Sequence, residues 1–233
     1  MNCCQCEATD EHFGEERVKH ELRRYRLKGP NPVTRILLEG LRAQNLQGST
    51  LLDVGSGMGV ILLELVDDGI SSATLVESSS AYLKVAEAEA RRLGHHESVK
   101  FAHGDFVQLA EQLPNVDVVT LNRVVCCYPY FEQLMTASSQ KSRRWYALSY
   151  PRNRWFVRLG NSFENWTRSR RNDPFRTYIH PEHRIHEIML DAGFDWKLYR
   201  GTLTWQVAIY DRSEAVERGI REPLDNKTSY TRF

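Results

Sequence analysis

The stretch that decides the fold is Leu51-Leu-Asp-Val-Gly-Ser-Gly-Met-Gly59, an apolar run that leads directly into three closely spaced glycines. Apolar residues at helical spacing follow over 60–68. This order predicts a buried strand, a tight turn and a helix, because glycine permits backbone conformations that a Cβ forbids. The free N–H groups at the start of that helix would face a ligand held over the turn. The spacing is G-x-G-x-G rather than the G-x-G-x-x-G of dinucleotide-binding folds, so the turn alone does not specify the ligand.

Strand and helix patterns alternate around this turn. Further strands are expected at 73–77, 99–103, 116–121 and 145–149, and helices at 15–27, 32–43, 81–93, 106–112, 130–138 and 182–192. Such alternation predicts an α/β fold, a mostly parallel sheet with helices on both faces. Two successive strands, 194–200 and 202–210, meet at Gly201 and predict a C-terminal antiparallel hairpin.

Composition bounds the class of protein. The chain has 233 residues, of which 41% are hydrophobic and 26% charged, with 31 Lys and Arg against 30 Asp and Glu. These values fit one α/β domain and exclude collagen, low-complexity disorder and a disulfide-dense mini-protein. Because neither a secretory signal nor an apolar run of about 18 residues is visible, we expect a soluble, cytoplasmic protein.

The domain is expected to span 15–212. We expect residues 1–14 to form a disordered tail, residues 213–233 a loose C-terminal tail, and residues of about 152–178 a lid-like insertion. The cysteines are reduced thiols rather than a disulfide framework, since their number is odd. They are Cys3, Cys4, Cys6, Cys126 and Cys127. Plain packing is the expectation for the last two, and a zinc site in the tail would lack a nearby fourth ligand.

Distinctive polar groups follow four successive predicted strands. They are the glycine turn beside Asp53, then Glu77-Ser78, Gly104-Asp105-Phe106 and Asn122-Arg123. Ligands of open α/β sheets bind at the carboxyl ends of the strands, so these groups are expected at one site. A carboxylate at position 77 can accept both hydroxyls of a ribose, and Asp105 with Phe106 can hold an adenine. The alternatives are that Asp53 only caps the turn and that Glu77 is a solvated strand end.

The ordered set DVGSGMG, LVES, HGDF and DVVTLNRVV, followed by a strand hairpin, resembles the class I S-adenosylmethionine-dependent methyltransferases over residues 33–211. The resemblance implies a Rossmann-like seven-stranded sheet whose last strand is antiparallel, with S-adenosyl-L-methionine as cofactor. Within the family it is most similar to small-molecule enzymes of the magnesium-protoporphyrin O-methyltransferase-like group.

The resemblance also implies roles for individual residues. The methionine moiety would lie against Asp53 and the turn formed by Gly55, Ser56, Gly57 and Gly59. Glu77, next to Ser78, would hold the ribose; Gly104, Asp105 and Phe106 would hold the adenine, and Asn122 would lie beside the sulfonium. Leading helices often close over the cofactor in this family, which makes Tyr25 a further cofactor-binding candidate.

The acceptor side offers three candidate catalytic residues. Methyl transfer from a sulfonium is an in-line displacement, for which positioning and exclusion of water supply most of the acceleration. A general base helps only some acceptors. Arg123 is expected to neutralise an anionic acceptor and Tyr128 to wall or deprotonate one. His180 is a candidate base, its alternative being a helix-start residue.

No metal is expected. His180, His183 and His186 are spaced by three residues, so the first and third lie about 120° apart around a helix and do not converge on one ion. No cluster of acidic ligands follows the strand 116–121. Methylation is therefore expected to survive chelation of divalent cations.

The near-zero net charge hides a strongly basic segment. Residues 141–176 contain nine arginines and one lysine against Glu164 and Asp173, together with three tryptophans. Positions 155, 156, 159, 163 and 166 share one helical face. Three readings stay open: a cover helix that buries its aromatics on the sheet, a lid over an apolar anionic substrate, and an interfacial helix on anionic lipid.

We therefore expect an S-adenosylmethionine-dependent methyltransferase that modifies the O, S or N atom of a small molecule. The acceptor is expected to be apolar or aromatic and anionic. The alternatives are an RNA methyltransferase that uses the Arg/Trp-rich insertion and a non-catalytic S-adenosylmethionine-binding module. DNA is not an expected partner, peripheral membrane contact stays open, and the sequence does not determine the oligomeric state.

Overall fold

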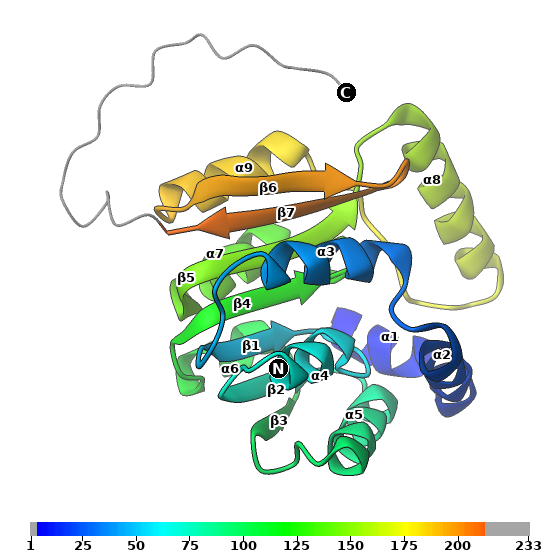
Figure 1. Ribbon diagram of the computed structural model, residues 1–233. Coiled ribbons are helices and arrows are strands. Elements are labelled where there is room, and N and C mark those ends of the chain that lie inside the picture. The colour runs from blue at the N-terminus through cyan, green and yellow to red at the C-terminus, as the bar shows by residue number, and fades with distance from the viewer. Residues whose placement is uncertain (1–3, 213–233) are drawn as a thin grey trace, which may run out of the picture.

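A seven-stranded mixed sheet organises the part of the chain that the computed structural model describes, residues 4–212 (Figure 1). Its strands are β1 (Thr50–Val54), β2 (Ser72–Glu77), β3 (Val99–His103), β4 (Val116–Asn122), β5 (Ser142–Pro151), β6 (Asp195–Gly201) and β7 (Trp205–Asp211). The order across the sheet is β3-β2-β1-β4-β5-β7-β6. β1 to β5 are parallel, and β7 runs antiparallel to both β5 and β6. The predicted fold class and the C-terminal hairpin are confirmed.

The strand order reverses direction between β1 and β4. From β1 the chain first winds outward through β2 to β3, and then returns to place β4 on the other side of β1. Connections that leave a parallel sheet in opposite directions open a crevice at the carboxyl ends of the two central strands. The fold therefore positions a ligand site beside Val54 and Asn122, the last residues of these strands.

Helices cover both faces of the sheet, and each face has its own apolar core. One core packs α3 (Pro32–Arg42), α4 (Val60–Asp67) and α5 (Ser80–Leu93) on the sheet. The other packs α6 (Phe106–Leu109), α7 (Phe131–Lys141) and α9 (Glu182–Asp191) on the opposite face, with the short 3-10 turns η1 (Ala110–Gln112) and η2 (Val125–Cys127) between them. Residues that alternate along each strand feed the two cores in turn, as the two-sided burial of a parallel sheet requires.

The segment before the sheet is helical from near its start. α1 (Cys4–His12) and α2 (Glu15–Lys28) lie beyond the carboxyl ends of the strands (Figure 1), where we expected residues 1–14 to be a disordered tail. Ala8 is buried, and Oδ1 of Asp10 accepts hydrogen bonds from the backbone N and the Oγ of Ser80 at 2.7 and 3.0 Å. These contacts join positions 70 residues apart, and a tertiary contact of that kind leaves no local sequence pattern. The expected C-terminal tail, 213–233, lies outside the described residues.

The insertion at 152–178 contains one long helix, α8 (Trp155–Arg170), at the same end of the molecule as α1 and α2 (Figure 1). No residue of α8 is buried, so the alternative of a helix that buries its aromatics on the sheet is wrong. The chain returns toward the sheet through Phe175, which is 2% exposed. Across residues 4–212, no helix combines the length and the apolar content that crossing a bilayer requires.

Two helical glycines allow a matched test of packing. A methyl group on Gly40 of α3 would lie 2.5 Å from Cδ1 of Ile209 in β7, whereas nothing lies within 4 Å of one on Gly160 of α8. Gly40→Ala is therefore expected to lower the free energy of unfolding by about 1–3 kcal/mol through overpacking. Gly160→Ala is expected to raise it by up to about 1 kcal/mol through helix propensity. Urea denaturation measures both, and equal effects of the two substitutions would contradict the packing of α3 on β7.

Candidate active site

A cavity of about 550 Å³ lies at the carboxyl ends of the central strands, within the range of small-molecule sites. Twelve residues expected to contact cofactor or acceptor line it. They are Tyr25, Gly55, Ser56, Gly57, Glu77, Ser78, Gly104, Asp105, Phe106, Asn122, Arg123 and Tyr128. Asp53, Gly59 and His180, also expected at the site, are not among the lining residues. The structure thus brings the four strand ends together as predicted.

The glycine turn forms the floor of the cavity. Gly55, Gly57 and Gly59 have φ values of 61°, 58° and 77°, in the left-handed region that disfavours other residues. A Cβ on Gly55 would lie 2.8 Å from Val124, so the turn also requires glycine for close packing. Gly59 is the N-cap of α4, and its left-handed backbone joins the turn to the helix.

Glu77 holds this turn against the end of β2. Its Oε2 accepts a hydrogen bond from the backbone N of Gly57, and its Oε1 accepts one from the backbone N of Ser79, both at 2.8 Å. The side chain is 5% exposed, and burial raises its pKa although these backbone hydrogen bonds lower it. Oγ of Ser78 lies 3.5 Å from Oε1, and a carboxylate has about four acceptor positions, so capacity remains for a hydroxyl donor from the cavity. Glu77 is therefore a fixed anionic acceptor rather than a solvated strand end.

Asp53 lies beneath the turn rather than in the cavity. It is fully buried in β1, and its Oδ1 accepts a hydrogen bond of 2.6 Å from Oγ1 of Thr120 in β4. Its Oδ2 is buried and makes no hydrogen bond in the described part of the chain. Burial raises the pKa of Asp53 to about 7. Asp53, expected at the methionine site, therefore does not line the cavity: side chains alternate along a strand, and this one lies beside its partner Thr120 on the sheet face that α3 and α4 cover.

Asp105 and Tyr128 close the side of the cavity expected to hold adenine. Tyr128 donates its hydroxyl to Oδ2 and Oδ1 of Asp105 at 3.0 and 3.1 Å, and Oδ1 of Asp105 also caps α6 through the backbone N of Val107. Phe106 is 4% exposed beside them. Because its hydroxyl proton is directed at a carboxylate, Tyr128 serves as a wall of the cofactor side and is not arranged as a base for the acceptor.

Asn122 and Arg123 lie where the cofactor side of the cavity meets the acceptor side. Asn122 donates from Nδ2 to Oγ1 of Thr34 at 2.9 Å and accepts at Oδ1 from Oγ of Ser149 at 2.8 Å. Arg123 has a φ of 65°, which is unusual for a residue with a Cβ, and its backbone N donates to Oγ of Ser149 at 2.9 Å. Its guanidinium lies 5.2 Å from the centre of the Trp205 ring. A strained backbone held by β5 therefore fixes the direction of this arginine.

His180 supports the wall of the cavity from behind. Its Nε2 lies 3.0 and 3.1 Å from the carbonyl oxygens of Val125 and Tyr128, and its ring stacks on Phe131 with centroids 4.0 Å apart. Burial lowers its pKa, so the imidazole is neutral and donates to these carbonyls. The expectation of a catalytic base is corrected in favour of the helix-start alternative, since the side chain is used to position the turn that carries Tyr128.

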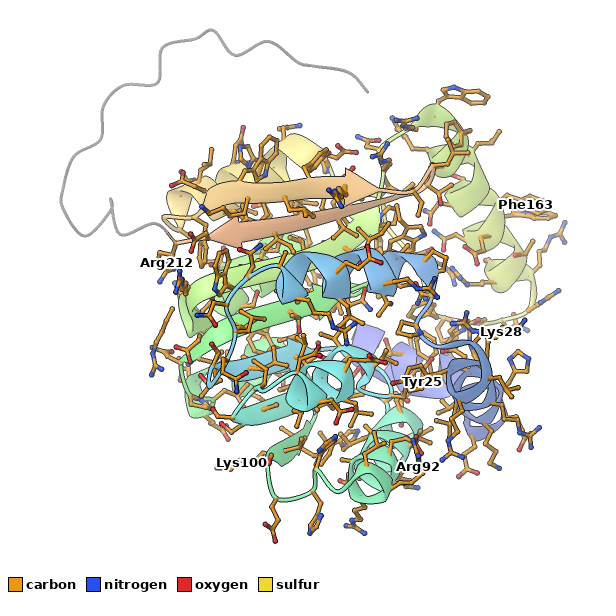
Figure 2. All side chains as sticks on the ribbon, viewed as in Figure 1. Tyr25, Lys28, Arg92, Lys100, Phe163 and Arg212 are labelled. Atoms are coloured by element: carbon orange, nitrogen blue, oxygen red, sulfur yellow. The ribbon has the colours of Figure 1, made fainter. Side chains whose placement is uncertain are left out.

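The helices before the sheet border the cavity. Tyr25 of α2, labelled in Figure 2, lines it and donates its hydroxyl to Glu64 at 3.0 Å; its role in cofactor binding stays a prediction. Burial raises the pKa of Tyr25, so the phenol stays protonated. His12 stacks on Phe175 with centroids 4.3 Å apart, and its Nδ1 donates to Oδ2 of Asp173 at 2.7 Å. His12 and Phe175, both lining residues, were not expected at the site. They lie about 160 residues apart, and no local pattern in the sequence links them.

The two central cysteines also line the cavity. The Sγ atoms of Cys126 and Cys127 lie 3.6 Å apart, and both thiols are free. Cys126 packs in the core as expected. Among the described residues, no group of three His, Cys, Asp or Glu side chains is arranged to hold a metal ion. The side chains of the N-terminal cysteines lie outside this description.

Sheet order, glycine turn and the carboxylate at the end of β2 together define the fold class of the class I, S-adenosylmethionine-dependent methyltransferases. The family model described as "Methyltransferase domain" matches residues 45–169, just over half of the chain. The chain belongs to this methyltransferase family.

Individual relatives are more distant. A tRNA1(Val) (adenine(37)-N6)-methyltransferase from Shewanella frigidimarina is 28% identical over 102 residues, which span 43% of this chain and only 41% of that enzyme. The magnesium protoporphyrin IX methyltransferase of Synechocystis, solved with bound SAH, has a TM-score of 0.68 at 19% identity and covers 90% of this chain and 100% of its own. Geranyl diphosphate C-methyltransferase from Streptomyces coelicolor has a TM-score of 0.62 at 15% identity, covering 86% and 84%. These two structures share the fold with this chain.

Asp53 generates a test of stability against pH. In the folded chain the pKa of Asp53 is raised from 3.8 to about 7, so its carboxyl stays protonated up to about pH 7. In the unfolded chain the same carboxyl loses its proton near pH 3.8. Between these values the folded state binds more protons, so Asp53 lowers the free energy of unfolding as pH rises, by up to about 1.4 kcal/mol per unit. Asp53→Asn keeps an acceptor for Thr120 and removes this dependence. Urea denaturation at pH 5 and pH 8 should show the variant gaining on the wild type at pH 8; parallel pH profiles would contradict the burial.

Glu77 generates a test of the cofactor side. Glu77→Ala and Glu77→Gln are expected to weaken S-adenosylhomocysteine binding at least about tenfold, because hydrogen bonds to a charged group contribute about 1.5–3 kcal/mol each. Isothermal calorimetry measures the affinity, and circular dichroism checks that both variants fold. Glu97→Ala removes an exposed carboxylate and is the matched control. Absence of binding by the wild type at millimolar ligand would overturn the cofactor assignment.

Proposed function

We propose that this methyltransferase transfers a methyl group from S-adenosylmethionine to an O, S or N atom of a small, apolar and anionic molecule. The observation that carries the proposal is the position of Arg123, at the end of β4 next to Asn122 and inside the same cavity as the glycine turn. Arg123 forms no ion pair with a carboxylate of the described residues, and its guanidinium faces an aromatic ring. An anion is the partner that this cation can accept.

The residues present fit the cofactor. Three glycines keep the turn compact, Glu77 has acceptor capacity left for a ribose hydroxyl, and Phe106 with Asp105 forms a wall for the adenine. Asn122 is held at both ends and presents its amide group where the methionine end would lie. When bound, S-adenosylmethionine supplies an electrophilic methyl group.

Apolar side chains form much of the acceptor side. Phe156 and Val157 of α8 line it together with Ile179 and Trp205, and the polar side chains of Asn161, Glu164, Arg168 and Thr177 also line the cavity. Such a wall suits a flat or apolar body whose negative group lies against Arg123.

The described side chains act by positioning. α8 lies over the acceptor side and α1 with α2 over the cofactor side, so closure of these elements excludes water from the displacement. Neither Tyr128 nor His180 is arranged to remove a proton from the acceptor. The proposal therefore favours acceptors that are nucleophilic as bound, such as a carboxylate, a phenolate or a thiolate.

An RNA acceptor is the second candidate, because the matched Shewanella enzyme is a tRNA methyltransferase and α8 presents arginine and tryptophan to solvent. Small-molecule turnover and RNA methylation distinguish the two. Cofactor binding without turnover on either substrate class would support a non-catalytic module.

The experiment is a panel of carboxylates, phenols, thiols, amines and RNA, each incubated with labelled S-adenosylmethionine. Turnover is expected on small anionic acceptors. Arg123→Gln is expected to raise KM for them at least about tenfold, with unchanged S-adenosylhomocysteine affinity, since a hydrogen-bonded charge pair contributes about 1.5–3 kcal/mol. Arg143→Gln, at an exposed arginine near Asp117 on the far end of β5, is the control. Equal KM values for anionic and neutral acceptors, or labelling of RNA alone, would contradict the proposal.

A further inference from the structure

α8 exposes its large apolar side chains to solvent, whereas an ordinary surface helix packs such side chains against the core. Its inward side is mixed: Asn161, Glu164 and Arg168 line the cavity together with Phe156, Val157 and Gly160. Its outward side consists of large apolar side chains. Trp155, Leu159, Phe163 and Trp166 are 77%, 65%, 64% and 53% exposed, and we call these four residues the α8 stripe. A surface helix normally places its apolar side chains on the core, so this orientation requires an explanation outside the described fold.

The α8 stripe is continuous. At 100° per residue its four members fall within an arc of about 80°, and they extend over about 16 Å along the helix axis. The rings of Phe163 and Trp166 stack with centroids 5.8 Å apart. Figure 2 shows Phe163 on the outer side of α8, pointing away from the sheet. Contiguous exposed apolar surface of this kind marks an interaction site.

The β6–β7 turn extends this surface at the start of α8. The backbone N of Arg152 donates to the carbonyl of Thr204 at 2.8 Å, which fixes the turn beside the entry to the helix. Leu203 at the tip of that turn is 67% exposed. Two elements far apart in the sequence therefore present apolar side chains in one region.

Positive charge flanks the stripe. Arg154, Arg158, Arg170 and Arg171 are all exposed, and the guanidinium of Arg170 lies 5.2 Å from the centre of the Trp166 ring. The acidic residue of α8, Glu164, is on the cavity side and pairs with Arg168 at 2.9 Å. The outward surface therefore combines apolar side chains with arginines that form no ion pair within residues 4–212.

We propose that the α8 stripe docks on an anionic lipid surface, with α8 lying in the plane of the interface. Tryptophan, phenylalanine and leucine on one face, with arginines at its edges, are the composition by which helices insert shallowly among charged headgroups. A symmetric contact between two copies of this chain would place these arginines against one another. Bases of RNA stack on aromatic rings in a groove, whereas this surface lies along one exposed helix and has Leu159 between its aromatic residues.

Docking of this kind gives the cavity a second access route. The same helix lines the acceptor side with its inner residues, so an apolar anionic acceptor dissolved in the lipid would reach Arg123 along α8. This consequence rests on the proposed function, whereas the docking itself does not, because it requires no methyl transfer.

The test is co-sedimentation of the full chain with vesicles of phosphatidylcholine alone and of phosphatidylcholine with 30% phosphatidylglycerol. Binding is expected only to the anionic vesicles and is expected to weaken as salt is raised. Replacing all four stripe residues by serine should reduce binding at least about tenfold, and Leu190→Ser, at an exposed apolar residue of α9, should leave it unchanged. Replacing the four flanking arginines by serine should also reduce it at least about tenfold, given the contribution of each basic residue near an anionic surface.

A second readout places the stripe in the lipid. Vesicles with bromine in their acyl chains quench tryptophans that enter the bilayer, so they should quench the wild type. The double variant Trp155→Phe/Trp166→Phe should still sediment but lose most of the quenching. Failure to sediment with anionic vesicles, equal binding to neutral vesicles, or quenching unchanged in the double variant would each overturn the proposal. Two further results would overturn the proposal. One is a dimer in analytical ultracentrifugation that is lost when the stripe residues are replaced by serine, and the other is RNA binding that is lost in the same variant.

Discussion

The buried carboxylate of Glu77 is the interaction on which the site depends. A charged group away from water is costly unless it is hydrogen-bonded, and here the backbone N–H groups of Gly57 and Ser79 supply both bonds at 2.8 Å. One donor belongs to the glycine turn after β1 and the other to the N-cap of α5. The carboxylate therefore fixes the turn, the end of β2 and the start of α5 relative to one another, and it does so before any ligand binds.

Polar side chains at the neighbouring strand ends are also fixed by hydrogen bonds from other elements. Two polar side chains at the cavity are held by residues from other elements: Asn122 by Thr34 and Ser149, and Asp105 by Tyr128. A site built from such pairs is preorganised, because the side chains do not have to reorient when the cofactor arrives. The pairing also explains why candidates for acid–base chemistry lose that role here. Tyr128 and His180 direct their protons at acceptors of the protein itself.

The sequence predicts the sheet, its hairpin and many of the residues that line the cavity, because an apolar run, a glycine turn and a strand-end carboxylate are local patterns. It fails where a role depends on contacts between distant positions. The stacking of His12 on Phe175 joins the two ends of the cavity and leaves no trace in either segment, so α1 was expected to be disordered. Asp53 differs for another reason: spacing places it beside the turn, but alternation along β1 puts its side chain on the covered face of Leu51, where it pairs with Thr120 of β4.

Helix α8 shows how far periodicity can lead. The pattern of Trp155, Leu159, Phe163 and Trp166 correctly predicts an apolar face. It does not say whether that face points inward, because periodicity carries no information on what lies against either side of the helix, and no residue of α8 is buried. Asn161 and Glu164 line the cavity together with Phe156 and Val157, so this side of the helix is partly polar. The four residues of the α8 stripe are exposed on the other side. The net charge of +1 likewise conceals this arrangement, since the arginines around the stripe are balanced by acidic residues on other surfaces. Orientation, rather than composition, decides what this segment contacts.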